Sequence, residues 1–271
     1  TQIQVKDFDE RTRTAFGNFF LKLIKGEFYI DNFGEFFTED ICEEFFKCLI
    51  SDVYCESLVD FYYLPQYKEE KYKEYLAPII TKGSYAEILT LLEFLADFSS
   101  RYDVDQFGYR QMYGVNIKRS IVQEINRIFE YEFVGYKFVG DIITPITDEI
   151  EIKEIEAGLS VEFGGCRSHI QKALAFLSDR ENPDYTNSIK ESISAVESIC
   201  QIIAENNKAT LGQAIKMLED KGIKLHSALK SAFSSLYGYT SDEGGIRHAE
   251  GLFESNVTFE EAKYMLVSCC A

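Results

Sequence analysis

The chain has no tryptophan, four prolines and three histidines among its 271 residues. Because proline interrupts helices, so few prolines favour long helical segments. The three histidines lack ligand spacing, and the seven cysteines form no Cys-x-x-Cys pair, so no clustered set of zinc ligands is evident. The sequence therefore predicts a mainly α-helical protein with no metal and no other cofactor.

Targeting signals and membrane segments are also missing. No signal-peptide pattern opens the chain, and no apolar run is long enough to span a bilayer. The odd number of cysteines argues against a complete disulfide framework. We therefore expect a cytoplasmic protein with reduced thiols and no membrane partner. Because the chain lacks an initiating Met and ends on the apolar run 265–271, we expect a fragment whose last helix continues.

Positive charge is scarce, since the formal net charge is −17. Such a charge repels nucleic acid in general, so a nonspecific nucleic-acid coat protein is excluded. A phosphate-containing ligand requires cations that converge locally. Lys118, Arg119 and Arg127 are the candidate binding residues, and the alternative is that they form a solvated helix face.

Apolar residues make up 46% of the chain, and 22 Phe and 17 Tyr predict an aromatic core, chiefly in the first half. Helical spacing recurs over 8–24, 39–49, 51–64, 66–75, 85–103, 115–133, 149–158, 160–178, 185–203, 211–221, 224–238 and from Thr258 onward. Residues 136–146 change to short β-branched and aromatic runs around Gly140-Asp141, which predicts a two-stranded hairpin. We expect a helical domain at 1–148 that ends in this hairpin and a second helical domain at 149–271.

The stretch 241–250 concentrates unusual chemistry, with two glycines before Arg247 and His248. A guanidinium group binds phosphate oxygens through two parallel hydrogen bonds, and an imidazole transfers protons near neutral pH. An Arg-His step can therefore serve phosphodiester cleavage, with Glu250 as an orienting carboxylate. The structural alternative is that Arg247 pairs with a carboxylate such as Glu197 while His248 packs in a turn.

Three stretches resemble the C-terminal domain of AbiJ-like abortive-infection proteins. They are 182–200, 241–249, which contains the sequence Ile-Arg-His-Ala, and 259–270. Residues 135–149 resemble the hairpin that closes the N-terminal domain of that group. The resemblance implies a HEPN-like four-helix bundle at the C-terminus. Members of that wider class are often metal-independent ribonucleases of phage defence and toxin–antitoxin systems, usually dimeric. The resemblance thus implies RNA or tRNA as substrate, a homodimer, and an antitoxin or phage-derived trigger as partner.

The chain departs from the active HEPN signature, in which a histidine follows the arginine by four to six residues. Counted from Arg247, those positions hold Gly251, Leu252 and Phe253. Two interpretations stay open. The domain is a variant endoribonuclease that uses Arg247, His248 and Glu250, or it is a noncatalytic HEPN fold that dimerises as a sensor or binds a nucleotide or partner. The apolar seam from Ile189 to Ile203 suggests where two copies meet.

Overall fold

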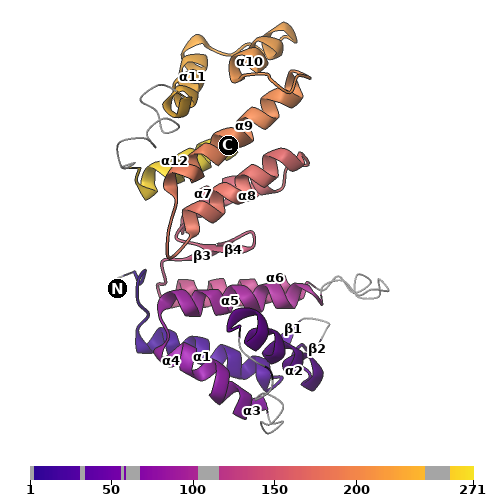
Figure 1. The fold of residues 1–271 in the computed structure, drawn as a ribbon, viewed down its shortest axis with the longest axis vertical. Helices are drawn as coiled ribbons and strands as arrows, with labels where there is room; N and C mark the ends of the chain where they lie inside the picture. The colour runs from indigo at the N-terminus through magenta and orange to yellow at the C-terminus, as the bar shows by residue number, and fades with distance from the viewer. Residues whose placement is uncertain (1–2, 31–33, 56–57, 59–67, 103–115, 242–256) are drawn as a thin grey trace. The chain divides into compact units, whose positions relative to one another are not determined.

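The computed structural model describes residues 3–30, 34–55, 58, 68–102, 116–241 and 257–271. The chain divides into two compact units, Thr1–Pro145 (unit 1) and Ile146–Ala271 (unit 2). The described residues are mainly helical, as the sequence predicted, and Figure 1 shows the order of the elements along the chain.

The elements of unit 1 are α1 (Glu10–Ile24), β1 (Tyr29–Ile30), β2 (Gly34–Glu35), α2 (Glu39–Cys48), the π-helical turn η1 (Leu49–Val53), α3 (Lys68–Lys71), the π-helical turn η3 (Tyr72–Leu76), α4 (Ala77–Lys82), α5 (Tyr85–Ser100), α6 (Ile117–Tyr131), β3 (Lys137–Val139) and β4 (Ile142–Thr144). The antiparallel pairing of β1 with β2 was not predicted. A continuous helix from residue 51 was wrong, because Cys55 has a φ of 55°, outside the helical region. Helix α4 follows the predicted helical range 66–75 and contains Pro78 in its first turn, where a missing N–H costs little.

The core of unit 1 is aromatic. Phe16, at 0% exposure, packs edge-to-face against Phe8 and Phe129, with ring centroids 5.7 and 6.0 Å apart. A second cluster links α2 to α5, where Phe45 contacts Phe98 edge-to-face at 5.3 Å. Edge-to-face contacts add to the large apolar area that these rings bury. The predicted aromatic core in the first half of the chain is confirmed.

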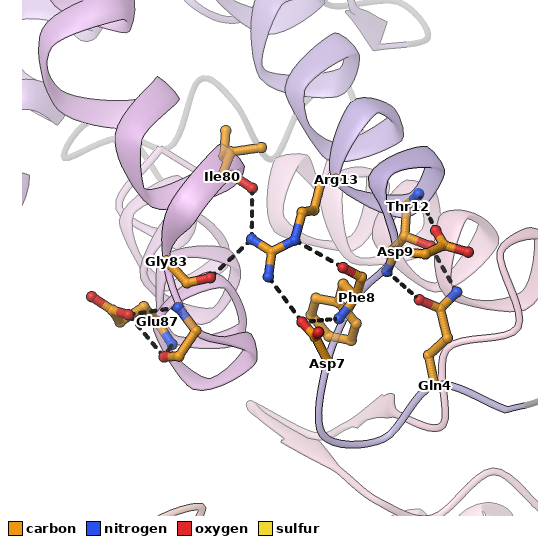
Figure 2. Close-up of polar contacts among 10 residues, drawn as sticks. Gln4, Asp7, Phe8, Asp9, Thr12, Arg13, Ile80, Gly83 and Glu87 are labelled. Carbon is orange, nitrogen blue, oxygen red and sulfur yellow. Dashed lines mark hydrogen bonds and ion pairs between the residues drawn. The ribbon is translucent and has the colours of Figure 1, made fainter.

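Arg13 clamps the N-terminal segment onto the loop between α4 and α5 (Figure 2). Its guanidinium donates to the carbonyls of Phe8 at 2.8 Å, Ile80 at 3.1 Å and Gly83 at 2.8 Å, and to the Asp7 carboxylate at 3.1 Å. Gly83 also makes a close approach that other residues cannot make, because a Cβ there would lie 2.4 Å from the carbonyl oxygen of Ile79. The clamp thus joins segments that lie about seventy residues apart in sequence.

The predicted hairpin is confirmed as β3 and β4, which pair antiparallel with Phe138 opposite Ile143. Gly140 has a φ of 59°, so the turn falls at the predicted Gly140-Asp141 step. A two-stranded hairpin needs other elements for stability. Helices of unit 1 provide them: Asn126 of α6 accepts from the Phe138 N–H at 3.0 Å, and Glu93 of α5 accepts from the Ile143 N–H at 2.6 Å.

Unit 2 contains α7 (Glu149–Leu159), α8 (Gly164–Ser178), α9 (Tyr185–Ile203), α10 (Leu211–Asp220), α11 (Ser227–Ser241) and α12 (Phe259–Cys270). Figure 1 shows α8 and α9 side by side, and the fully buried Ser188 of α9 donates to the Ala173 carbonyl of α8 at 2.8 Å. Ile189 and Ile193 are also buried within the unit. These two residues of the predicted seam therefore pack the unit's own core.

Candidate functional site

Arg247, His248 and Glu250, the predicted catalytic residues, lie outside the described residues. Their predicted roles stay predictions. The structure does describe the elements on either side of residues 242–256, which are the C-terminal end of α11 and the first turn of α12. It also describes α9, which carries Glu197, the carboxylate named above as an alternative partner for Arg247.

Glu197 is half-buried between α9 and α11, and it accepts a hydrogen bond from the Tyr237 hydroxyl at 2.5 Å. Two residues further along α11, Tyr239 lies within the electrostatic influence of Glu261 of α12. Burial and the charge of Glu261 raise the pKa of Tyr239. The Tyr237–Glu197 bond ties the end of α11 to α9.

The start of α12 is fixed by a capping box. The Thr258 hydroxyl accepts from the Glu261 N–H at 3.2 Å, and the Glu261 carboxylate accepts from the Thr258 N–H at 2.8 Å. The Thr258 N–H and hydroxyl both donate to this carboxylate, at 2.8 and 3.1 Å, and hold the pKa of Glu261 below its ordinary value. The first turn of α12, which follows residues 242–256, is therefore held by its own side chains.

A second polar pair joins α8 to α9. Nδ1 of His169 lies 2.6 Å from Oε2 of Glu191, and both side chains are partly exposed, at 31% and 24%. A carboxylate on one ring nitrogen fixes the orientation of an imidazole and leaves the other nitrogen for a second partner. No sequence motif marks this pair. In the described parts of the chain, no group of three or more His, Cys, Asp or Glu side chains could hold a metal ion.

The three predicted binding residues lie on α6, but the structure does not bring them onto one face. Lys118 and Arg127 are nine positions apart, which places them on opposite sides of a helix. Lys118 pairs with Asp141 of the hairpin turn at 2.6 Å, and Arg127 donates to both carboxylate oxygens of Glu124 at 2.8 and 2.6 Å. Arg119 is exposed. A common phosphate-binding role for all three residues stays a prediction.

Three thiols of unit 2 are not activated as nucleophiles. Burial raises the pKa of Cys166 and Cys200, and burial with the neighbouring Cys166 raises the pKa of Cys269 to about 12. A raised pKa keeps a thiol protonated, whereas catalysis by cysteine requires the thiolate. These cysteines pack as small apolar residues.

One protein-family model, AbiJ N-terminal domain 4, matches residues 1–161. The chain belongs to this family. The match covers all of unit 1 and continues through α7 at the start of unit 2. AbiJ membership associates the chain with abortive infection, a form of phage defence. No curated protein and no solved structure matches the chain. No described helix is both long enough and apolar enough to cross a membrane.

Proposed function

We propose that this AbiJ-family chain is a cytoplasmic abortive-infection effector whose HEPN-like domain, residues 149–271, cleaves RNA without a metal ion. In this proposal His248 removes the proton from a ribose 2′-hydroxyl, and the 2′-oxygen attacks the adjacent phosphorus. The 5′-oxygen then leaves with the proton that His248 took up, which produces a cyclic phosphate end. Arg247 stabilises the negative charge on the phosphoryl oxygens, and Glu250 orients the imidazole.

The observation that supports this proposal is the anchoring around residues 242–256. The Tyr237–Glu197 bond ties α11 to α9, and the capping box fixes the first turn of α12. Catalytic side chains need a rigid frame, since small displacements reduce rates strongly.

The test compares Arg247→Ala and His248→Ala with two control variants of the same residue types. Arg167, exposed on α8, and His226, exposed just before α11, provide the controls as Arg167→Ala and His226→Ala. Expression should arrest growth, and purified protein should cleave single-stranded RNA or tRNA loops in excess EDTA. Each site variant should lose roughly a hundredfold or more in rate, as for removal of one transition-state group.

The two controls should cleave at the wild-type rate. Retained cleavage in either site variant contradicts the catalytic assignment. A melting temperature that falls enough to explain the loss also contradicts it, because Arg247 or His248 would then be structural.

A noncatalytic, dimerising sensor is the second candidate function, and exposed apolar side chains in unit 2 support it. Leu229 and Phe233 on α11 are 44% and 38% exposed, and Ile223 before the helix is 52% exposed. None of the α11 residues with a described side chain is buried. We propose that a second copy covers this face in a homodimer, and that an antitoxin or phage-derived trigger competes for it. Light scattering of Phe233→Glu, which should be monomeric if the wild type is a dimer, tests this proposal.

A further inference from the structure

A cleft of about 220 Å³ opens between α1 and α6 of unit 1. Its apolar part consists of Ala15, Phe19 and Ile128, of which Phe19 and Ile128 are buried. Polar side chains surround that part at helical spacing of four: Asn18 and Lys22 on α1, and Arg127 and Tyr131 on α6. The volume is below the roughly 300–1,000 Å³ of pockets that enclose drug-sized ligands, so a ligand of that size would lie only partly inside the cleft.

The two carboxylates of the cleft are already neutralised. Glu124 accepts two hydrogen bonds from Arg127, and Glu132, whose side chain is 9% exposed, pairs with Arg11 at 2.9 Å. Two cations and two carboxylates line the cleft, and Arg127 is paired with Glu124, whereas Lys22 forms no ion pair with any residue that the structure describes. An ammonium group that no described carboxylate neutralises favours an anionic ligand over a metal cation.

The groups left for a ligand are hydrogen-bond donors and one ring face. Lys22 forms no ion pair, and Asn18 forms no side-chain hydrogen bond, with any residue that the structure describes. Tyr131 is 66% exposed, and the Arg11 guanidinium lies 5.4 Å from its ring centroid. A ring with a cation on one face still offers its other face for stacking.

We propose that this cleft binds one nucleoside monophosphate unit, with the base stacked on Tyr131 and the phosphate on Lys22. The unit comes from a free mononucleotide or from single-stranded RNA, because both present the same base and phosphate. This inference does not depend on the proposed cleavage, since the cleft belongs to unit 1 and contains none of the predicted catalytic residues.

The experiment measures binding of AMP, GMP, CMP, UMP, adenosine and a short single-stranded RNA by calorimetry. The full chain is used with His248→Ala in the background, so that RNA stays intact whether or not the wild type cleaves it. Tyr131→Ala should weaken nucleotide binding about tenfold, because loss of one base–aromatic stack costs about that factor. Lys22→Gln should weaken AMP binding and leave adenosine binding unchanged. Tighter binding of RNA than of every mononucleotide identifies RNA as the source, and the reverse order identifies a free nucleotide.

Two control variants make the test specific. Lys25→Gln removes an exposed lysine that follows the end of α1 and does not line the cleft. Tyr264→Ala removes a tyrosine on α12 that is 60% exposed. Both should bind as the wild type does. The proposal is overturned if neither mononucleotides nor RNA bind at millimolar concentration. It is also overturned if Lys22→Gln and Tyr131→Ala, with unchanged melting temperatures, bind like their controls.

Discussion

The two units bury different kinds of side chain. Unit 1 encloses Phe16, Phe20, Phe45 and other phenylalanines at 0–1% exposure, whereas no described Phe or Tyr of unit 2 is buried. Unit 2 instead buries aliphatic residues, and between α8 and α9 it buries Ser188 and Ser192. Small side chains let helix backbones approach closely, while large rings fill wider spaces between helices.

This difference separates a well-anchored unit from one that leaves surface for partners. Unit 1 has the Arg13 clamp and the aromatic core, and its hairpin is bonded to two helices. In unit 2, α11 exposes Leu229 and Phe233. The residues that we propose for catalysis and dimerisation belong to unit 2. The proposed catalytic and dimerisation residues are thus in the unit whose helix α11 leaves apolar side chains exposed.

The largest expected effect comes from one phenylalanine in each unit. Phe16→Ala removes a fully buried ring that packs against two others, so the free energy of unfolding should fall by about 3–5 kcal/mol. Phe233→Ala removes a ring of 38% exposure and should cost under about 1 kcal/mol. Urea unfolding followed by tyrosine fluorescence measures both. Equal losses would contradict the contrast between the two cores.

The Arg13 clamp should give the next largest effect. Arg13→Ala leaves the carbonyls of Phe8, Ile80 and Gly83 without this donor, and we expect a loss of about 2–3 kcal/mol. Arg119→Ala, which removes an exposed arginine, should change stability by less than about 0.5 kcal/mol. Hydrogen exchange should show faster exchange at the Gly135 N–H, which pairs with Gln4 of the clamped segment. Unchanged exchange there would mean that the segment is held without Arg13.

Ser192 tests the close packing of α8 against α9. Ser192→Leu inserts a large side chain at a position of 0% exposure and should destabilise the protein by about 1–2 kcal/mol. Ser192→Ala keeps the volume small and removes only the bond to the Ser188 carbonyl, so it should cost less than the leucine variant. The opposite order of the two variants in thermal melts would show that the hydroxyl, and not the small volume, matters at this position.

Local patterns predicted much of this fold. The apolar spacing of Ile117, Ile121, Ile125 and Ile128 predicted α6, and all four side chains are buried. Thr38 and Thr258 cap helices where the sequence placed them. The failures had two different causes. Pro78 continues a helical stretch because it falls in the first turn of α4, which is a local effect. The β1–β2 pairing was missed because two-residue strands are too short to show an alternating pattern.

For the candidate site, the sequence indicated which residue types take part but not which side chains meet in the fold. His169 and Glu191 lie 22 residues apart, and their pairing follows from the antiparallel hairpin of α8 and α9, in which residues equally distant from the turn face each other. The pairing could therefore be predicted once the two helices were predicted. The cleft between α1 and α6 could not be predicted, because no sequence signal links Lys22 to Tyr131 across more than a hundred residues.

The smallest effect should come from pH, through the thiol of Cys42 in the core of unit 1. Cys42 is 1% exposed, and burial raises its pKa to about 11. In the unfolded chain a thiol ionises near 8.5. Because the folded-state pKa is the higher one, the stability that this thiol contributes is complete below about pH 8.5 and is lost as the pH rises toward 11. Between pH 8 and 9.5 we expect a loss of about 1 kcal/mol from this group.

Other groups titrate in the same range, so the measurement is a difference between variants. Unfolding of the wild type and of Cys42→Ala is followed at pH 8, 9 and 10, and the wild type should lose stability more steeply. Cys55→Ala, which removes an exposed thiol, should keep the wild-type slope. Parallel slopes for the wild type and Cys42→Ala would mean that the Cys42 thiolate is tolerated inside the folded protein. Water would then reach the aromatic core of unit 1 near α2. The cores of the two units would in that case differ in the packing of aromatic rings and not in the exclusion of water.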